Sequence, residues 1–398
     1  MRISTSQIYS QTIASISKSL SDYTEVSNQT SSQKKLNAPS DDPAGMGNVV
    51  NLRSYDQSLE SYYNNAELAG SLLGTADGLL SEASTLMSSV LEQAEQGSTG
   101  TYSDDQQQSM AESMMAYQDS MLAIANSKSG DDYLFSGEAT DTSPYEYVPG
   151  VTITGDSPAK SDFSSFTGDL DDPIIVQFTS DGTVGTNDID YTYSLDGGST
   201  WLTGTILSTD NTMDFGDVTV DLSTGTSVTA WDDDEDTGSS FVVRNSVSYK
   251  GADEAMSIDI GENTEIDVNT VGSDIFGGVD ADTGEAYSGS NLFESISDAI
   301  AYLWIGDEEG VASTIESISD GEVQLTVEAS NVGAREEKAD FISTSLSYAR
   351  ERVSSAISDE EDADSAALTV ELSKAQYIYQ AVLSSTSQVI SMSILDYL

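Results

Sequence analysis

The chain has no cysteine and no histidine, and these two absences remove most of the usual catalytic and metal-binding chemistry. Without cysteine there is no disulfide, no thiolate nucleophile and no cysteine-ligated zinc or iron–sulfur site. Without histidine there is no Ser-His-Asp triad, no histidine-ligated metal and no imidazole acid–base catalyst. Catalysis would have to rest on carboxylate, lysine, tyrosine or hydroxyl groups. The composition therefore restricts catalysis to a few mechanisms. We expect a chain that is not an enzyme and that carries no cofactor and no metal.

Basic residues are also scarce, with 14 Lys and Arg against 68 Asp and Glu and a net charge of -54. Such a charge repels DNA, RNA and anionic lipid surfaces, so we expect no nucleic-acid partner and no membrane partner. We interpret the acidity as a solvated surface, and its relation to a saline habitat is left open.

Long apolar runs are missing as well, since no stretch approaches the 18 apolar residues of a transmembrane helix. The opening residues MRISTSQIYS have no apolar core and no small-residue cleavage site. This start predicts either a protein that stays inside the cell or one exported with an uncleaved N-terminus.

What the chain does have is an unusually long run of residues that follow a heptad period. Thirteen consecutive heptad positions are apolar or aromatic, namely Leu52, Tyr55, Leu59, Tyr62, Ala66, Ala69, Leu73, Ala76, Leu80, Ala83, Met87, Val90 and Ala94. This seam predicts a helix of about 63 Å at about 1.5 Å per residue. A helix of that length needs partner helices along it, which indicates a structural protein.

Shorter seams with the same period lie near both chain ends. The N-terminal seam consists of Tyr9, Ile13, Ile16, Leu20 and Tyr23. Further seams are Met110, Met114, Tyr117, Met121 and Ile124, then Leu325, Val332, Ala339, Ile342, Leu346, Ala349, Val353 and Ala356, and finally Leu368, Leu372, Ala375, Tyr379, Val382, Thr386 and Val389. This regularity at both ends predicts that the terminal segments pack against each other.

The long helix has readable ends. Asp42 can serve as its N-cap, with Pro43 in the first helical turn, and Gly97 marks its end. Inside it, Gly70, Gly74 and Gly78 recur every fourth residue. Each glycine costs a helix about 1 kcal/mol relative to alanine. The three glycines form a ridge of small residues that permits another helix to approach closely. An equal alternative is that a long bundle tolerates glycine at these positions.

Between about residues 145 and 286 the pattern changes to short β-rich runs separated by turns. The runs include Ile174–Phe178, Tyr191–Leu195, Phe215–Val220 and Phe241–Val243, and Asp196-Gly197-Gly198 indicates a hairpin turn. A helix over Asn291–Ile305 is expected to lead back to the helical part.

These patterns predict an α+β fold, in which a long antiparallel, coiled-coil-like helical bundle from the N- and C-terminal segments carries an inserted β-rich domain. The expected division is an N-terminal helical arm (1–40), a helical rod (41–140 and 290–357), an acidic β-rich insert (141–289) and a C-terminal helical arm (358–398). The arms are rich in serine and poor in large apolar groups, which makes isolated helices marginal. We expect them to be disordered in the monomer and to fold against neighbouring subunits. The alternative is that they fold onto their own rod.

Acidic motifs in the insert leave two minor alternatives. Asp236-Thr237-Gly238 and Asp282-Thr283-Gly284 resemble the aspartic protease signature, but their acidic flanks favour solvated turns over a buried carboxylate pair. Asp232 to Asp236 offers oxygen ligands for a weak calcium site, without the full spacing of an EF-hand loop.

The terminal motifs resemble the family of bacterial flagellar hook-associated protein 3, which includes hook–filament junction proteins. The resemblance lies in the opening MRISTSQIYSQTIASI, the segment Asn37–Gly45, the segment Tyr133–Gly137, the run Val332-Gly333-Ala334-Arg335 and the ending Ser393–Leu398. It covers roughly residues 1–140 and 290–398. Flagellin shares the general helix plan and a related Asp-Asp turn, but the ending LDYL favours the junction protein.

The resemblance implies a structural adaptor of the flagellum that joins the hook, through the first junction protein, to the flagellin filament. Expected partners are those axial proteins, copies of the chain itself in a ring, and an export chaperone. Export without a cleaved signal would place the protein outside the cell, on the flagellum. The expected assembly interface consists of Tyr9, Ile13, Ile16, Leu20, Tyr23, Leu368, Leu372, Tyr379, Val382, Val389, Ile394, Leu395 and Leu398.

Three alternatives remain open from the sequence. One is a flagellin, the filament subunit, which copy number would distinguish from a junction protein. A second is a secreted carboxylate hydrolase carried on the insert. A third is an adhesin whose insert binds a surface ligand.

Overall fold

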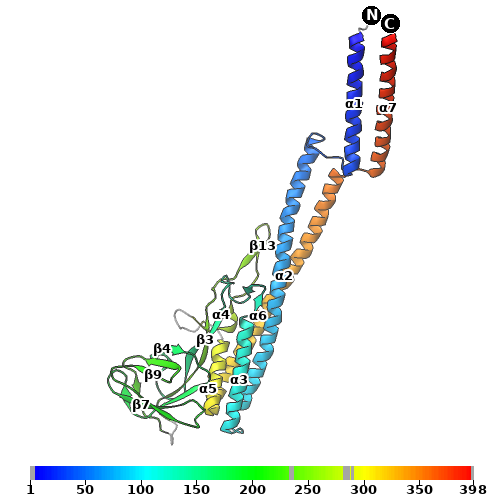
Figure 1. The fold of residues 1–398 in the computed structure, drawn as a ribbon. Helices are drawn as coiled ribbons and strands as arrows, with labels where there is room; N and C mark the ends of the chain where they lie inside the picture. Colours follow the sequence, from blue (N-terminus) through cyan, green and yellow to red (C-terminus); the bar gives the residue numbers. More distant parts are fainter. Residues whose placement is uncertain (1–4, 233–236, 281–286, 288–290, 396–398) are drawn as a thin grey trace. The chain divides into compact units, whose positions relative to one another are not determined.

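The computed structural model describes residues 5–232, 237–280, 287 and 291–395 (Figure 1). The chain forms two compact units, one of residues 1–64 and 342–398 and one of residues 65–341. Helices from both chain ends flank a β-rich middle, so the predicted α+β fold with an inserted β-rich domain is confirmed. The finer division into two arms, a rod and an insert stays a prediction.

Two long helices, α2 (Pro43–Gly97) and α6 (Glu308–Glu361), lie side by side and run in opposite directions (Figure 1). The predicted seam of α2 is buried at Leu59, Ala66, Ala69, Leu73, Ala76, Leu80, Ala83, Met87, Val90 and Ala94. The facing seam of α6 is buried at Leu325, Val332 and Ala339. Tyr55 does not follow the prediction, because its side chain is 55% exposed. Tyr55 belongs to the unit of the chain ends, which holds neither α5 nor the described strands of the insert.

The ends of α2 follow the predicted capping chemistry. The Ala44 backbone N–H donates a hydrogen bond to the Asp42 carboxylate at 3.0 Å, as expected for an N-cap. The next helix, α3 (Asp104–Ala125), begins after Ser103, whose backbone N–H donates to the side-chain oxygen of Gln106 at 3.1 Å. These caps fix where the long helix starts and where its neighbour begins.

Helix α5 (Leu292–Ile305) is largely buried, with ten of its fourteen residues buried. It begins at Asn291, whose side-chain oxygen accepts from the Glu294 backbone N–H at 3.1 Å. It packs against α3 and against strand β12 (Ser240–Tyr249). With these contacts on two sides, α5 joins the helical layer to the insert. The helix predicted over Asn291–Ile305 is therefore confirmed.

Fourteen further strands, a 3-10 turn at Lys160–Asp162 and the short helix α4 (Gly272–Phe276) complete the described chain between α3 and α5. The strands are β1 (Lys128–Ser129), β2 (Asp132–Tyr133), β3 (Tyr145–Ile153), β4 (Phe163–Gly168), β5 (Ile174–Phe178), β6 (Gly182–Thr183), β7 (Ile189–Ser194), β8 (Leu202–Ile206), β9 (Thr212–Asp214), β10 (Val218–Leu222), β11 (Ser227–Val228), β13 (Ser257–Gly261), β14 (Thr264–Asp267) and β15 (Val279–Asp280).

The main sheet of the insert is built around β12. Strands β3 and β5 pair with β12 in antiparallel register, β15 pairs with it in parallel, and β7 and β8 extend the sheet beyond β5. A smaller sheet has the order β4-β10-β9. The strand predicted over Ile174–Phe178 is β5, and the predicted turn lies between β7 and β8, where Gly197 and Gly198 have φ of 66° and 89°. Apolar residues from both sheets, among them Val176, Phe178, Val220 and Phe241, form one core.

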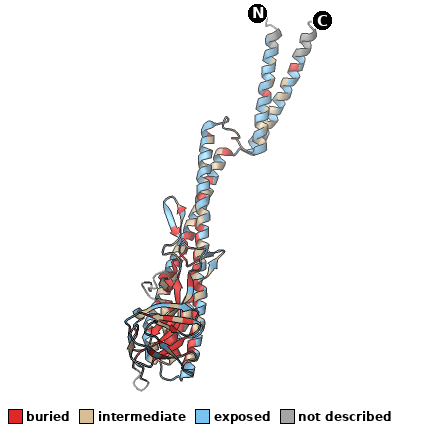
Figure 2. Cartoon of the chain, turned by 60° about the vertical axis from the view of Figure 1, so that its left-hand side comes forward, coloured by how far each residue is buried: buried red, intermediate tan, exposed pale blue. Residues whose placement is uncertain are grey.

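Helices α1 (Thr5–Ser32) and α7 (Ser365–Leu395) lie side by side in the unit that holds the chain ends (Figure 1). Figure 2 shows that buried residues gather in the β-rich part of the chain, whereas the helices next to the marked chain ends, α1 and α7, are mostly exposed or half-buried. The prediction that both arms are disordered in the monomer stays a prediction.

Candidate assembly surface

The contact between α1 and α7 is narrow. Tyr23 stacks on Tyr379, with ring centroids 6.0 Å apart and ring planes 7° from parallel. Of the predicted interface residues, Leu368 is buried, and Ile16, Tyr23, Leu372, Tyr379 and Val382 are half-buried. One side of the predicted seam thus faces the partner arm within the same chain.

The other predicted residues of α1 face solvent. Tyr9, Ile13 and Leu20 are 58%, 51% and 44% exposed. On α7, residues outside the predicted set are exposed too, namely Val370, Tyr377, Ile378 and Leu383. The side chains of Val389, Ile394 and Leu395, and Leu398 as a whole, lie outside the described part of the chain. Contiguous exposed apolar groups of this kind mark interaction surfaces.

A groove runs between α1 and α7. It encloses about 510 Å³ and is lined by Gln11, Thr12, Ser15, Tyr377, Ile378, Ala381, Val382, Ser385 and Thr386. The α1 wall is polar and the α7 wall is largely apolar. Two helices alone leave such a groove open, because each covers only one side of the other.

Where the arms meet α2 and α6, the two connecting segments are joined to each other, and we call this joint the elbow. Lys34 and Asp362 form an antiparallel bridge. The Lys35 backbone N–H donates to the Glu361 carbonyl at 2.8 Å, and the Ala363 N–H donates to the Gln33 carbonyl at 3.1 Å. The elbow is therefore held by backbone hydrogen bonds between segments far apart in the sequence.

The Glu361 carboxylate adds an ionic contact to the elbow. Its side chain is 8% exposed, and it accepts hydrogen bonds from Lys34 at 2.7 Å and from Arg53 of α2 at 2.6 Å. Partial burial alone would raise the pKa of Glu361, but these hydrogen bonds and charges outweigh it and lower the pKa. Glu361 therefore stays ionised and fastens the end of α6 to α2 and to the segment that follows α1.

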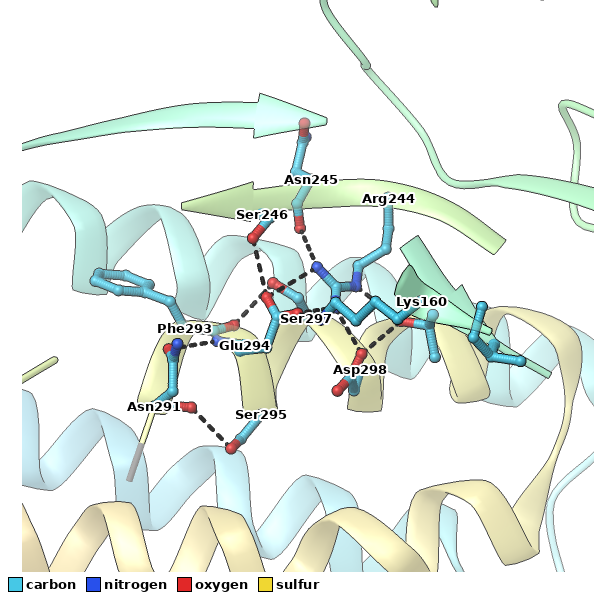
Figure 3. Close-up of polar contacts among 12 residues, drawn as sticks. Lys160, Arg244, Asn245, Ser246, Asn291, Phe293, Glu294, Ser295, Ser297 and Asp298 are labelled. Carbon is cyan, nitrogen blue, oxygen red and sulfur yellow. Dashed lines mark hydrogen bonds and ion pairs between the residues drawn. The ribbon is translucent and has the colours of Figure 1, made fainter. Parts of the chain in front are cut away.

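A second ionic cluster lies between the insert and α5 (Figure 3). Arg244 of β12 is 1% exposed and reaches Glu294 at 2.9 Å and Asp298 at 2.6 Å. Its Nε donates to the Thr152 hydroxyl at 2.8 Å, and Lys160 also pairs with Glu294. The buried guanidinium thus has carboxylate partners on α5, as a buried charge requires.

Electrostatics keep this cluster charged. Burial alone would raise the pKa of Glu294, but the Arg244 charge and hydrogen bonds, followed by those of Lys160, hold that pKa well below its ordinary value of 4.5. Burial would lower the pKa of Arg244, and the two carboxylates raise it instead. The cluster is a structural joint between the sheet and α5.

The elbow and the Arg244 cluster were not predicted from the sequence. Arg53 and Glu361 are 308 residues apart, and Arg244 and Glu294 are 50 apart. Such separations leave no periodic signal. The scarcity of basic residues was a usable signal for the Arg244 cluster, because Lys160, Arg244 and Lys250 are the only basic residues between residues 131 and 290.

The carboxylate alternatives find no support in the described residues. Asp236 and the triplet Asp282-Thr283-Gly284 lie outside them. In the part of the chain that the structure describes, no three acidic side chains gather in a way that could hold a metal ion. Within the same residues, no helix is long and apolar enough to cross a membrane.

Two family models match the helical ends of the chain. Residues 3–140 match the bacterial flagellin N-terminal helical region, and residues 315–398 match the bacterial flagellin C-terminal helical region. Together they cover more than half of the chain and leave the insert unmatched.

Curated relatives narrow the assignment. Flagellar hook-associated protein 3 of Escherichia coli is 31% identical over 157 residues, which is 39% of this chain and 49% of the relative. The protein of the same name from Salmonella typhimurium is 28% identical over 151 residues, or 38% of this chain and 48% of the relative. A flagellin from Listeria monocytogenes is 30% identical over 105 residues, or 26% of this chain and 37% of the relative. The matched parts thus span about half the length of the hook-associated relatives. The chain belongs to the flagellin family, and its matched parts are similar to flagellar hook-associated protein 3.

Proposed function

We propose that the chain is a structural, non-enzymatic component of the bacterial flagellum that joins the hook to the flagellin filament. The observation that carries this proposal is the combination of hook-associated relatives with terminal helices that leave large apolar side chains exposed. A junction component must contact different proteins on its two sides, and exposed helical arms provide surfaces for such contacts.

Assembly would be driven by burial of the arms. Each large apolar side chain that passes from water into a contact contributes about 1.5–3 kcal/mol when fully buried. Tyr9, Ile13 and Leu20 of α1 and Tyr377 of α7 have this surface to lose. In this proposal helices of neighbouring subunits fill the groove between α1 and α7, and the order of the arms is completed only in the assembly.

The partners that follow from this role are the first hook-associated junction protein on the hook side and flagellin on the filament side. Copies of the chain itself would form a ring between them. An export chaperone would hold the arms before assembly, and export with an uncleaved N-terminus would place the protein outside the cell. Incomplete apolar arms support the need for such a chaperone.

Electron microscopy of intact cells with a gold-labelled antibody to the insert tests the role directly. We expect label at one point, where the hook meets the filament. Cells lacking the protein are expected to keep hooks and lose attached filaments. Label along whole filaments, or normal filaments in the deletion strain, would contradict the proposal.

A second candidate is a flagellin, favoured by the match to the Listeria protein. The two candidates differ in copy number, because a filament subunit is needed in great excess over a junction protein. Quantification of the chain against hook protein in purified flagella separates them. A few copies per hook support the junction, and a large excess supports the filament subunit.

A further inference from the structure

Strand β8 forms one end of the main sheet of the insert. In the described sheets its hydrogen-bonded neighbour is β7 alone, so its outer edge has no strand partner there. Strand β9 lies near β8 but belongs to the smaller sheet. Thr203 and Thr205 of β8 are both exposed. An exposed strand edge of this kind is a template on which another strand can pair.

The ladder with β7 shows which backbone groups of β8 are available. The Thr179 N–H donates to the Asp190 carbonyl at 2.9 Å, so the backbone groups of Asp190 point toward β5. Because these groups alternate along an antiparallel strand, the next residue of β7 points toward β8, where it pairs with Gly204. The backbone groups of Gly204 therefore point inward. By the same alternation, the N–H and C=O groups of Thr203 and Thr205 point away from the sheet.

This edge is uncharged within a strongly acidic region. Residues 131–290 hold 33 Asp and Glu against three basic residues, yet residues 197–209 carry no charge and form the longest uncharged run in that region. Natural proteins protect sheet edges with charged side chains or proline, and β8 has neither. The residues that flank it are exposed and apolar, with Trp201 at 41% and Leu207 at 51%. The edge of β8 thus lacks the usual protection against pairing.

The sequence of the edge is nearly symmetrical about Gly204. Outward from this glycine, the chain has threonine on both sides, then leucine or isoleucine, and then Trp201 or Leu207. If two such strands meet antiparallel across a two-fold axis at Gly204, Thr203 lies opposite Thr205 and Trp201 lies opposite Leu207. Threonine pairs stabilise antiparallel strands, and a tryptophan opposite a leucine buries apolar surface. The edge is therefore complementary to itself.

We propose that β8 of one copy of this chain pairs antiparallel with β8 of a second copy, across a two-fold axis at Gly204. The outward backbone groups of Thr203 exchange hydrogen bonds with those of Thr205 in the other copy, and the two six-stranded sheets become continuous. Trp201 of each copy covers Leu207 of the other. A second copy is the occupant that fits, because each feature of the edge finds its complement in the same edge.

Carboxylates near the edge set the conditions for this pairing. Asp188 and Asp190 lie just before and on β7, and Asp196 and Asp210 bound the uncharged run. Two copies bring these like charges toward each other, so repulsion opposes the contact at low salt. The Debye length falls from about 10 Å at 0.1 M salt to about 3 Å at 1 M. The pairing should therefore strengthen as the salt concentration rises.

This contact goes beyond the proposed function. Neighbours in a ring are related by rotation about one axis and meet through two different patches, whereas a two-fold contact uses the same patch on both copies. Pairing through β8 therefore joins copies that are free in solution or that belong to different assemblies. It is independent of the contacts that the terminal helices make.

The absence of cysteine allows a clean cross-linking test with the full-length chain. One variant carries Thr203→Cys and another Thr205→Cys, and each is oxidised mildly at high salt, alone and in an equal mixture. The two positions face each other at about 5.5 Å between Cα atoms in the proposed register, whereas each position lies at about 7–8 Å or more from its own copy. We expect several times as much linked dimer in the mixture as in either variant alone. As a matched control, Thr264→Cys, an exposed threonine of β14, is mixed with Thr203→Cys and should give only background dimer.

The apolar part of the contact is tested by adding Trp201→Asp to both cysteine variants. Trp201 is exposed and lies outside β8, so circular dichroism of the monomer should not change, while the dimer in the mixture should fall to the background level. The matched control adds Phe341→Asp, a change at another exposed aromatic residue, and should leave the dimer unchanged. The same mixture at low salt should give less dimer than at high salt.

A mixture that gives no more dimer than the background overturns the inference. So does a single variant that links to itself as well as the mixture links, because antiparallel pairing about Gly204 forbids it. Dimer that decreases as salt is added would also contradict the proposed contact. Each of these results leaves the location of the protein on cells unaffected, so failure here is separate from failure of the proposed function.

Discussion

The same heptad period produces two different results in the two units of this protein. In the unit of residues 65–341, Leu73, Leu80 and Met87 of α2 are fully buried. In the unit of the chain ends, Ile13 and Leu20 occupy equivalent positions on α1 and remain about half exposed. The α2 residues lie in a unit that also holds α3, α5, part of α6 and the sheets, whereas α1 packs mainly on α7.

This difference shows that a heptad pattern specifies which face is apolar and does not specify how many partners will cover it. A third or fourth partner element has to come from the same chain or from another molecule. In the unit of residues 65–341, α5 is such a further partner element. In the unit of the chain ends, the groove between α1 and α7 is left open. Four predictions test this comparison.

The largest loss of stability is expected at the Arg244 cluster, in the unit of residues 65–341. Arg244→Ala leaves Glu294 without its main partner and should lower the free energy of unfolding by about 3–5 kcal/mol. The matched change in the other unit is Arg350→Ala, which removes partly exposed pairs to Asp56 and Glu60 and should cost at most about 1 kcal/mol. Urea denaturation followed by circular dichroism measures both. Equal losses would remove the contrast between the units.

The second-largest loss of stability is expected from truncation of a leucine in the seam of α2. Leu80→Ala creates a cavity in a fully buried site and should cost about 2–5 kcal/mol. Leu20→Ala changes a side chain that is 44% exposed and should shift the stability of the isolated chain by no more than about 0.5 kcal/mol. The same denaturation experiment compares them. A large loss for Leu20→Ala would show that α1 is already packed in the monomer.

Acid should weaken the joint between the sheet and α5. The pKa of Glu294 is lower in the folded chain than its ordinary value of 4.5, so the unfolded chain takes up this proton first as the pH falls. The stabilisation from Glu294 is therefore complete well above pH 4.5 and is lost as the pH falls below it. Its loss should amount to about 1.5–3 kcal/mol, typical of a hydrogen bond to a charged group.

Glu294→Gln is the control for this acid effect. Its stability should be lower than that of the unchanged chain at neutral pH, and the two should converge as the solution is acidified. Denaturation curves measured from pH 7 downward give this comparison. A constant difference at every pH would mean that Glu294 does not titrate as inferred.

The smallest effect is expected at Gly78, where it should be favourable. Gly78→Ala should stabilise the monomer by about 1 kcal/mol, because the new methyl group meets no described atom and alanine favours the helix. At Gly74 the same change places a Cβ 2.8 Å from the Glu336 side chain, so the gain should be smaller. Thermal unfolding of the two variants measures the difference. A gain at Gly74 as large as at Gly78 would contradict the observed spacing of α2 and α6.

The parts of this fold that were predictable depend on local signals. The seam of α2, its start at Asp42 and Pro43, and the return helix α5 follow from period and capping chemistry in short windows of sequence. The pairing of β12 with its neighbours was not predictable, since short strands separated by turns permit many orders. The elbow and the Arg244 cluster depend on side chains brought together by that long-range order.

The candidate surface was predictable in the same limited sense. The sequence identified the apolar face of α1, but it could not divide that face between α7 and solvent. That division depends on how two separate helices are rotated about their axes. Tyr23 meets Tyr379 while Leu20, three residues away, faces outward.

The elbow has a mechanical consequence for the proposed role as a joint between hook and filament. Because Lys35 and Ala363 hydrogen-bond across to the opposite segment, and because Glu361 fastens both, tension on either terminal helix is carried by two covalent chains in parallel. A torque applied at one end therefore cannot peel a single strand away residue by residue. It must break two backbone hydrogen bonds and two ion pairs at the same moment, and that geometry resists rupture under load.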